Sequence, residues 1–542
     1  MTCLFDVRKH DFLARIGNLR VNEETVISTP AVCAVTDLFP SLKERAFTNL
    51  PLSAPASDAE KYFTAGTEPA AVHPKCTTDR ENGVYLFSNW NSVLDDSKRL
   101  LETLEELYAK IRPDAARYAP ASALPSNVAM LIYCGFDLFD YTAVDLCSVQ
   151  GKFLLPEGEF DASWMDKGVC CCEGCRTHNL QLHNRLALER EISFARAWLE
   201  RGELREFMEM RCRLHAPEVE LLRRIDRSTS FDSSLPAVRS SRFMANAGES
   251  IYRREIDLFE ERLVSRYHPP RNDVCVLLPC ASRKPYSLSR SHQMFVKVVD
   301  GRAHEVIVTS PLGIVPRELE LVYPAGHYDV PVTGFWDAEE QRILTDRVAS
   351  YLSAHRYERI ICHLDGGAKE VVLAAAARLG LSLEITCNDE RPLSQESLRA
   401  LNAALDGCRK KRNDFIHGTL LWQFGEDVDT SGLVVKGRYP QVKVLQKKLQ
   451  LFTTDPSTGL IRPTHEGWAR ITGYRVEISS GFVPQGDILA PGVASCDPRI
   501  REGDEVFVVG ENYAATGKAV MSAEEMLASN RGVAVKVRKT RK

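Results

Sequence analysis

The chain has 542 residues, of which 44% are hydrophobic and 26% charged, and its formal net charge is −4. This length predicts roughly three to five domains with ordinary buried cores, and the small negative charge excludes nucleic-acid binding through a global positive field. No stretch approaches the roughly twenty apolar residues of a membrane span, and the N-terminus lacks the apolar core of a signal peptide, so we expect a cytoplasmic protein that does not enter a membrane.

The first predicted domain covers residues 1–235. It begins with short alternating strands, and a stretch at 53–79 that is rich in Ala, Pro, Ser and Thr predicts a loop. Leucines at helical spacing predict a helix over 92–111. The apolar run at 128–133 predicts a strand.

A cluster of cysteines lies in the same domain, and sixteen cysteines without a secretory signal favour thiols and metal ligands over disulfides. Cys170, Cys172 and Cys175 form a Cys-x-Cys-x-x-Cys run. Three thiolates and one imidazole fit a tetrahedral structural zinc site. His183 and His178 both follow the run, and Cys171 is a further competing ligand.

The second predicted domain, residues 240–395, alternates strands and helices as a parallel α/β sheet does. An irregular segment at 310–336 is too apolar for disorder, and we expect it to close over a site. The predicted strands cover 274–278, 305–309, 359–363 and 383–387, and the predicted helices cover 289–299, 338–355 and 368–379.

The most informative motif follows the first of these strands. Within residues 279–292 the chain places a thiol, an amine, a phenol, a hydroxyl and an imidazole, carried by Cys280, Lys284, Tyr286, Ser289 and His292. Ligands bind beyond the carboxyl ends of parallel strands. A thiolate or a developing anion is stabilised there by the N-terminus of the following helix, so the motif predicts an active-site loop.

Acidic residues of the same domain suit recognition of a free ammonium group, which needs carboxylate partners. The candidates for substrate binding are Glu318, Asp329 and Asp365, and Glu339 and Glu340 lie in the same acidic stretch. Asp365 ends a predicted strand at the sheet edge. A solvated loop face is the alternative.

Two smaller domains are predicted at the C-terminal end. Residues 400–468 predict a small α+β accessory domain, and residues 470–542 predict a small β-barrel with strands at 475–479, 506–509 and 533–537. Basic residues concentrate here and predict RNA-backbone binding, with a merely solubilising tail as the alternative. They are Arg409, Lys410, Lys411, Arg412, Lys536, Arg538, Lys539 and Arg541.

The spacing Pro-Cys-x3-Lys-Pro-Tyr-x2-Ser-x2-His at residues 279–292 resembles the signature of the archaeosine synthases. These archaeal tRNA-modifying enzymes are themselves similar to tRNA-guanine transglycosylases. The resemblance implies an α/β multidomain protein with a degenerate transglycosylase-like (β/α) barrel that carries zinc, an α/β catalytic domain, a tRNA-binding accessory domain and a C-terminal PUA β-barrel. It extends over residues 5–30, 135–153, 170–217 and 422–425 and the C-terminal end.

The resemblance also implies roles for two sites of the first domain. It favours His183 as the fourth zinc ligand, because the ligand histidine of transglycosylases opens a long helix. Asp140 falls where the transglycosylase nucleophile lies, but the segment that carries the second catalytic acid of those enzymes is not found. We therefore expect Asp140 to be a relic or a structural carboxylate, and we keep it as a fourth candidate for substrate binding beside Glu318, Asp329 and Asp365.

The activity implied by the resemblance is transfer of an amine to the nitrile of 7-cyano-7-deazaguanine in the D-loop of tRNA. Cys280 would form a thioimidate, Lys284 would lower the thiol pKa, and His292 would take the proton of the incoming ammonium. Tyr286 and Ser289 would donate to the imidate nitrogen or bind the base. Direct attack by the amine would use the same residues.

Several alternatives stay open. The donor is free lysine, as in the best-described relatives, or glutamine, ammonia or another nitrogen donor, and a downstream partner enzyme would complete archaeosine. The rival functions are a base-exchanging archaeosine transglycosylase and a non-catalytic tRNA-binding subunit. The sequence does not decide whether the chain forms a homodimer.

Overall fold

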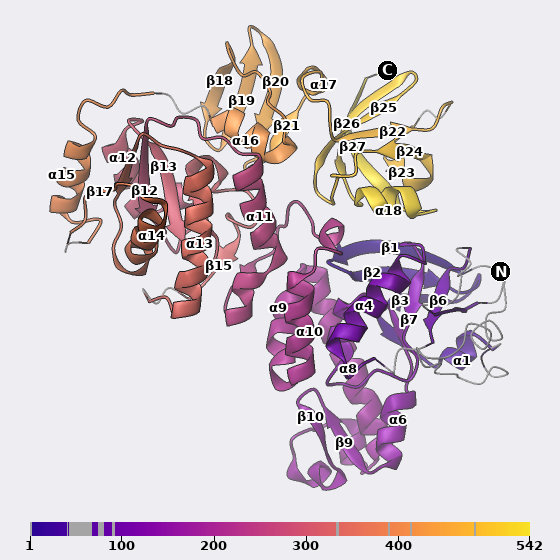
Figure 1. Ribbon diagram of the computed structural model, residues 1–542. Coiled ribbons are helices and arrows are strands. Elements are labelled where there is room, and N and C mark those ends of the chain that lie inside the picture. The colour runs from indigo at the N-terminus through magenta and orange to yellow at the C-terminus, as the bar shows by residue number, and fades with distance from the viewer. Residues whose placement is uncertain are drawn as a thin grey trace. The chain divides into compact units, whose positions relative to one another are not determined.

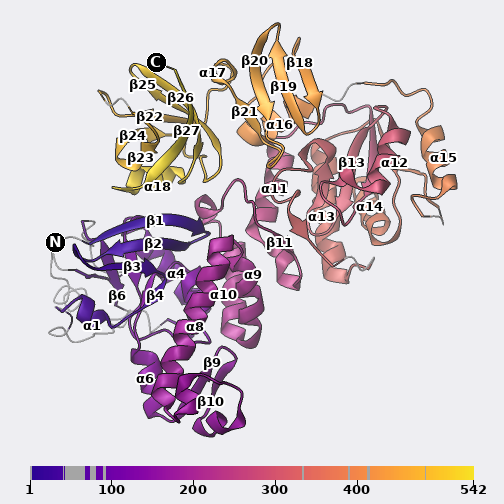
Figure 2. The ribbon, with the colours of Figure 1, turned by 180° about the vertical axis from the view of Figure 1, so that it is seen from behind.

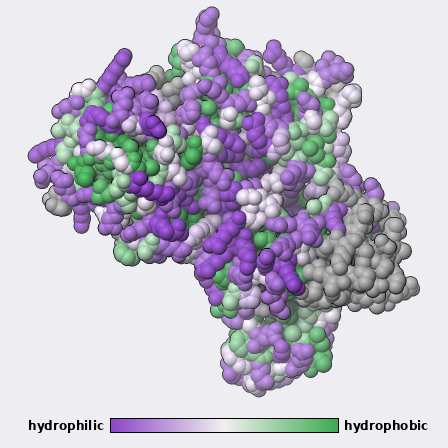
Figure 3. All heavy atoms as spheres, in the orientation of Figure 1, coloured by the Kyte–Doolittle hydropathy of each residue, from purple (hydrophilic) through white to green (hydrophobic). Residues whose placement is uncertain are grey.

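The computed structural model describes residues 3–40, 42, 68–73, 81–88, 93–331, 335–388, 391–411, 415–481 and 484–541. They form two compact units: residues 1–236 with 487–494 and 520–535, and residues 237–486 with 495–519 and 536–542 (Figure 1). Most of the predicted loop at 53–79, and Arg412, lie outside the described residues. Within the described ranges, no helix is long and apolar enough to cross a membrane. Hydrophilic side chains cover much of the face drawn in Figure 3.

Two sheets build the first unit. An antiparallel sheet has the order β1-β2-β3, and a parallel sheet has the order β4-β8-β7-β6-β5. The buried side chains of Phe5, Leu19, Tyr118 and Leu138 belong to one core between them. The strands are β1 Leu4–Asp11, β2 Ala14–Arg20, β3 Val26–Thr29, β4 Ala31–Val32, β5 Ala70–Val72, β6 Val84–Phe87, β7 Ala116–Tyr118 and β8 Leu138–Phe139.

Helices connect and cover these strands, and one of them corrects the sequence prediction. Residues 128–133 form a helix, α5, although their apolar run predicted a strand. All six residues are buried, so the run shows no period that could separate a strand from a buried helix. The segment joins β7 to its parallel neighbour β8, and such a connection usually contains a helix.

The helix predicted over 92–111 is shorter, because it begins after Asp96, whose side chain accepts the Arg99 N–H at 3.0 Å. The helices of the first unit are α1 Val35–Leu38, α4 Ser97–Tyr108, α5 Val128–Tyr133, α6 Thr142–Val149, α7 Glu173–Arg176, α8 Leu180–Arg201, α9 Leu204–Arg211 and α10 Ala216–Arg227. A hairpin of β9 (Lys152–Leu155) and β10 (Gly158–Asp161) precedes α7.

The second unit is built on a five-stranded sheet of order β14-β13-β12-β16-β17. Figure 2 shows this region from behind, where β13 of the sheet is labelled among the helices. Its strands are β12 Val274–Pro279, β13 His304–Thr309, β14 Gly313–Pro316, β16 Arg359–Cys362 and β17 Glu384–Ile385. Strands β13, β12, β16 and β17 pair in parallel and β14 is an antiparallel edge. The helices are α11 Arg254–Ser265, α12 Arg290–Val299, α13 Ala338–Ala354, α14 Gly366–Leu379 and α15 Gln395–Ala404.

These bounds confirm the predicted strands and helices of the α/β region, although β17 is shorter than expected. The described parts of the segment 310–336, residues 310–331 and 335–336, contain more regular structure than the sequence suggested. It contains β14 and also β15 (Tyr328–Asp329), which pairs with β11 (Phe243–Met244). The polar side chains at the ends of β12, β13 and β15 are thereby held on ordered strands.

The remaining elements follow α16 (Phe415–Phe424). One antiparallel sheet contains β18 Val434–Arg438, β19 Gln441–Gln446, β20 Leu449–Thr454 and β21 Ile461–Pro463. After α17 (His465–Trp468), a six-stranded sheet has the order β23-β27-β26-β25-β22-β24. Its elements are β22 Arg475–Ile478, β23 Ile488–Leu489, β24 Val493–Cys496, β25 Glu505–Gly510, β26 Tyr513–Ala519, α18 Ala523–Ala528 and β27 Val533–Arg541. The three strands predicted here from the sequence are confirmed.

Candidate functional site

Cys280 lies directly after Pro279, the last residue of the central strand β12. Its side chain is half-buried and packs against the core of the second unit. The position is therefore at the carboxyl ends of the parallel strands, where such sheets bind their ligands. A thiol at this place is reachable from solvent and is fixed by a strand.

His292 holds the backbone just before this cysteine. Its Nε2 lies 2.9 Å from the Pro279 carbonyl oxygen, and its Nδ1 lies 2.6 Å from an Arg317 amino nitrogen. Because a carbonyl only accepts and a guanidinium only donates, Nε2 carries the proton and Nδ1 accepts. Burial and the neighbouring guanidinium lower the pKa of His292 to about 3. The imidazole is therefore neutral, and both of its nitrogens are occupied.

Arg317 connects this histidine to two buried carboxylates. Its Nε and Nη2 donate to Glu305 Oε2 at 3.1 and 2.7 Å, and its Nη1 donates to Glu320 Oε2 at 3.0 Å. Glu320 also accepts the backbone N–H of Ser287 at 2.9 Å. Sequence reasoning missed Arg317, which lies 25 positions from its imidazole partner.

Tyr286 and Lys284 pack around Tyr328 of β15. The Tyr286 hydroxyl lies 2.5 Å from that of Tyr328, which also bonds to Thr309. Lys284 Nζ lies 3.8 Å from the centre of the Tyr328 ring. Burial lowers the pKa of Lys284, against the opposing effects of Cys280 and Asp329. The half-buried amine of Lys284 thus titrates below its ordinary range and lies close enough to the cysteine for the two groups to interact electrostatically.

Ser289 is the N-cap of α12. Its Oγ accepts the His292 backbone N–H at 3.2 Å and lies 3.1 Å from the Ser291 hydroxyl. This bond satisfies one of the N–H groups that a helix leaves free at its start. The structure therefore brings all five motif residues together and gives Ser289 a local structural bond.

Of the four carboxylates predicted to bind substrate, the three in the second unit are divided between the two ends of its parallel strands. Asp329 and Asp365 are exposed at the ends of β15 and β16, on the side of Cys280. Glu318 is buried, accepts the Tyr267 hydroxyl and pairs with His304, the first residue of β13, at 3.3 Å. It is therefore not brought together with the cysteine.

A cavity of about 240 Å³ opens at the ends of β11, β13 and β15. Its lining includes Trp336 and three acidic side chains from the start of α13, Asp337, Glu339 and Glu340, and no basic side chain. The Ser310 hydroxyl donates to Glu340, and burial raises the pKa of this carboxyl. The cavity favours a small cation over an anion.

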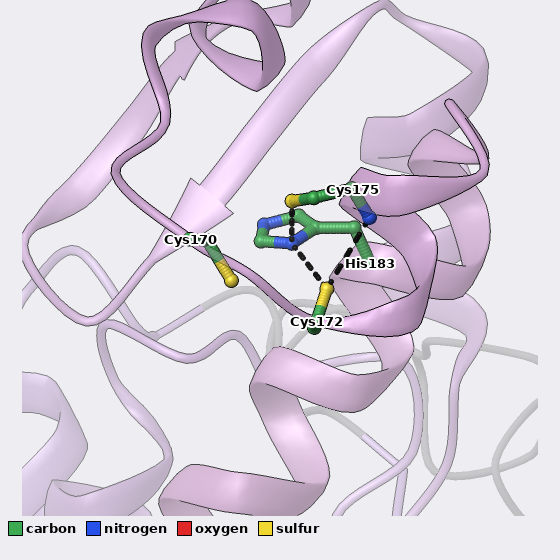
Figure 4. A group of neighbouring side chains, drawn as sticks. All are labelled: Cys170, Cys172, Cys175 and His183. Carbon is green, nitrogen blue, oxygen red and sulfur yellow. Dashed lines mark hydrogen bonds between the residues drawn. The ribbon is translucent and has the colours of Figure 1, made fainter.

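The cysteine cluster of the first unit has the geometry of a metal site (Figure 4). The ligand atoms of Cys170, Cys172, Cys175 and His183 all lie within 4.8 Å of one another. His183 Nδ1 is 3.3 Å from both Cys172 and Cys175 Sγ. Its Nε2 donates to the Leu154 carbonyl at 3.0 Å, the outer bond that typically orients a metal-binding imidazole.

Local packing explains why these ligands meet. A Cβ added to Gly174 in α7 would lie 2.3 Å from the backbone nitrogen of His183, so only glycine permits this approach of α7 to α8. Phe153 stacks on the His183 ring at 3.8 Å. The competing histidine, His178, has an exposed side chain beside Asp166. The four residues form a group able to bind a metal such as zinc.

Asp140 follows β8 and is 6% exposed. Its carboxylate accepts the Tyr118 hydroxyl at 2.5 Å and the backbone N–H groups of Ala121 and Thr142 at 2.9 and 2.7 Å. Three donors of this kind fix a loop, as a structural carboxylate does.

The predicted RNA-binding residues differ in whether their side chains form ion pairs within the protein. Arg538 donates two bonds of 2.7 Å to the buried Glu505, and Lys410 pairs with Asp300. On β27, the side chains of Lys536, Lys539 and Arg541 are exposed. Arg409 and Lys411, between α15 and α16, are exposed as well. Arg538 is therefore engaged in the fold of the C-terminal sheet.

The comparisons with known proteins agree with this architecture. The PUA domain family matches residues 474–540, and a family described as a domain of unknown function (DUF5591) matches residues 256–405, which include the Cys280 motif. The chain is thus an α/β protein with a PUA domain at its C-terminal end.

Curated relatives specify the family. The chain is 38% identical to the archaeosine synthase subunit alpha of Methanosarcina acetivorans over 85% of this chain and 80% of that protein. It is 34% identical to the archaeosine synthase of Haloferax volcanii over 99% of both chains. It is 25% identical to the tRNA-guanine(15) transglycosylase of Methanobrevibacter smithii over 82% of this chain and 69% of that protein. The chain belongs to the archaeosine synthase family.

Proposed function

We propose that this protein modifies tRNA on the path to archaeosine, by adding an amine to the nitrile of 7-cyano-7-deazaguanine in the D-loop. Family membership supports tRNA as the substrate. The observation that carries the chemistry is the half-buried Cys280 thiol at the carboxyl ends of the parallel strands, within electrostatic range of the half-buried amine of Lys284.

The reaction proceeds in two additions at one carbon. The Cys280 sulfur bonds to the nitrile carbon, one carbon–nitrogen π bond opens, and the nitrogen takes the thiol proton, which gives a thioimidate. The donor amine then adds to the same carbon, the carbon–sulfur bond breaks, and the surplus amine proton returns to the thiolate. The sum is addition of one N–H across the nitrile, which forms an amidine and needs no oxidant.

The roles that we propose for the surrounding residues differ from those predicted from the sequence. Lys284, whose pKa is lowered by burial, carries protons between the thiol, the donor amine and the imidate nitrogen. His292 has no free ring nitrogen, so it is a positioning residue that fixes the Pro279 carbonyl and hence the thiol. Tyr286 acts through Tyr328, and Ser289 through the start of α12.

The donor is a small amine that is cationic in solution, and we assign it to the cavity at the start of α13. Free lysine fits this chemistry, because an ammonium group finds the carboxylates of Glu339 and Glu340 and the face of Trp336 there. Asp329 and Asp365 flank the same edge of the sheet. A partner enzyme would then convert the lysine adduct to archaeosine.

The other domains support binding. The cluster of Cys170, Cys172, Cys175 and His183 holds a structural Zn²⁺, because four protein ligands leave no open position for chemistry. The parallel sheet β4-β8-β7-β6-β5 is the remnant of a transglycosylase-like barrel. The accessory and PUA domains, residues 400–468 and 470–542, bind the tRNA backbone.

The test compares two variants by two readouts. Cys280→Ala should abolish the mass gain of nitrile-bearing tRNA incubated with lysine, with tRNA binding intact, whereas Asp140→Asn should stay substantially active. Cys408→Ala, which removes another half-buried thiol of the same unit, is the matched control. Release of labelled base from tRNA is measured in parallel. Loss of activity in Asp140→Asn alone, with base release by the wild type, would replace the proposal by base exchange.

A further inference from the structure

Tyr328 lies among the residues of the Cys280 motif. Its side chain is 2% exposed and belongs to the core of the second unit. Its backbone is held by β15, which pairs in parallel with β11. The Lys284 amine lies over the ring, with Nζ 3.8 Å from the ring centre. Burial, and after it the neighbouring Cys280, raise the pKa of the Tyr328 hydroxyl. One buried ring therefore contacts the amine of the motif and lies within electrostatic range of its thiol.

The hydroxyl of Tyr328 belongs to a chain of three hydroxyls, and the geometry fixes the direction of its hydrogen bonds. Thr309 Oγ1 donates to the Ser310 carbonyl oxygen at 3.2 Å, because a carbonyl only accepts. The single proton of Thr309 is then used, so Thr309 accepts from the Tyr328 hydroxyl. Tyr328 in turn accepts from Tyr286, whose hydroxyl oxygen lies 2.5 Å away. The Tyr286 proton is therefore engaged within the protein.

This direction changes which group can donate to a nitrogen that forms at the thiol. Tyr286 was expected to donate there, but its proton is given to Tyr328. An amine has N–H donors in either protonation state. Among the described residues, no group accepts a hydrogen bond from Lys284 Nζ. Lys284 is therefore a donor that the geometry leaves available, and the Tyr328 ring is what holds it.

The contact between the amine and the ring favours one charge state. A cation within about 6 Å of the centre of an aromatic ring is attracted by the negative face of the ring. Burial of the half-buried Lys284 lowers its pKa, and Cys280 and Asp329 oppose this effect. The ring acts in the same direction as these two groups, because it also favours the ammonium. Loss of the ring should therefore free the amine and lower the pKa of Lys284 further.

We propose that Tyr328 is a positioning residue for the chemistry at Cys280: its ring face holds the Lys284 amine beside the thiol. The hydroxyl chain through Tyr286 and Thr309 fixes the orientation of the ring. The catalytic meaning of this contact rests on the proposed function, in which Lys284 carries protons, whereas the contact itself does not. Tyr328 acts through Lys284 and not on the reacting atoms.

The first experiment measures the protonation of Lys284 in the full chain, by competitive labelling with acetic anhydride read by peptide mass spectrometry. In Tyr328→Leu the pKa of Lys284 should fall by about one unit, because the ring no longer stabilises the ammonium. Tyr328→Phe keeps the ring and should leave this pKa unchanged. Cys280 and Asp329, the other groups that act on the charge of Lys284, are present in every variant.

A matched control separates this contact from general loss of packing. Tyr351→Leu removes another ring of the same core, on α13, whose side chain is 1% exposed. It should leave the pKa of Lys284 unchanged. The wild-type protein gives a second test that does not depend on the folding of a variant. Its ¹³C-labelled lysines should show an upfield-shifted ε-methylene resonance, which Tyr328→Phe keeps and Lys284→Arg loses.

Adduct formation on nitrile-bearing tRNA then connects the contact to the reaction. Turnover at saturating tRNA and lysine should fall more than about tenfold in Tyr328→Leu, with the KM for tRNA unchanged. Tyr328→Phe should stay close to the wild type. The proposal is overturned by an unchanged or raised pKa of Lys284 in Tyr328→Leu, by an equal fall in Tyr351→Leu, or by the lack of a shifted resonance. Labelling as expected, with no adduct formed by the wild-type protein, would support the contact and refute the proposed function.

Discussion

Arg317 is the residue whose replacement best tests the architecture around Cys280. Its guanidinium is the charged partner, among the described residues, of Glu305 and Glu320, whose side chains are 7% and 0% exposed. The Arg317→Met change removes this partner and leaves two buried carboxylates. Breaking a buried pair by removing one member costs about 3 to 5 kcal/mol, because the remaining charge stays desolvated. The change also removes the donor to His292 Nδ1.

We therefore expect the free energy of opening of the β12–β13 region to fall by about 3 to 5 kcal/mol in Arg317→Met. The pKa of His292 should rise, because the cation that helps to lower it is gone and two carboxylates remain. Peptide-resolved hydrogen exchange over residues 274–309 measures the local free energy, and alkylation of Cys280 measures whether the thiol is still positioned.

Two matched variants define the outcome. Arg317→Lys keeps the charge but not the planar set of guanidinium donors. Its free energy of opening should therefore fall by less than that of Arg317→Met. Arg342→Met removes an exposed arginine that pairs with Asp346 at 3.5 Å and should change the opening free energy by less than about 0.5 kcal/mol. A loss below about 1 kcal/mol in Arg317→Met would refute the argument that this guanidinium holds the site together.

Two further predictions concern the metal and RNA. We expect metal analysis to find zinc in the wild-type protein and in His178→Ala but not in His183→Ala, because only the His183 imidazole lies among the thiols; the reverse result would transfer the fourth ligand to His178. Replacing Lys536 and Lys539 together by Gln should weaken tRNA binding and reduce its salt dependence, with little effect on turnover at saturating tRNA. An unchanged affinity and salt slope would exclude β27 from the RNA-binding surface.

The sequence alone determined the elements whose pattern is local. Residues next to one another in the chain determine these elements. They include the strand at 274–278, the helix cap at Ser289 and the amphipathic helices at 289–299 and 338–355. The same holds for the three cysteines of the metal-binding group, which fall within six positions, whereas the choice of His183 came from the family resemblance and its approach past Gly174 from the structure. The family signature added the function class, since seven residues at fixed spacing, from Pro279 to His292, identify it.

The tertiary structure decided what depends on distant partners. Residues 128–133 form a helix and not the predicted strand. The sequence does not show this, because all six residues are buried and the run therefore lacks the periodicity that distinguishes a helix from a strand. Glu318 and Asp329 are close in sequence, but β14 runs antiparallel to β13 and reverses the chain direction. Glu318 therefore lies at the amino end of β13, beside His304, away from Cys280. Arg317, 25 positions from His292, donates to its Nδ1, and this contact is why we propose a positioning role for His292 in place of the base predicted from the sequence. The protonation state and the hydrogen bonds of a side chain depend on the groups that surround it in space. The sequence shows only which groups are its neighbours along the chain.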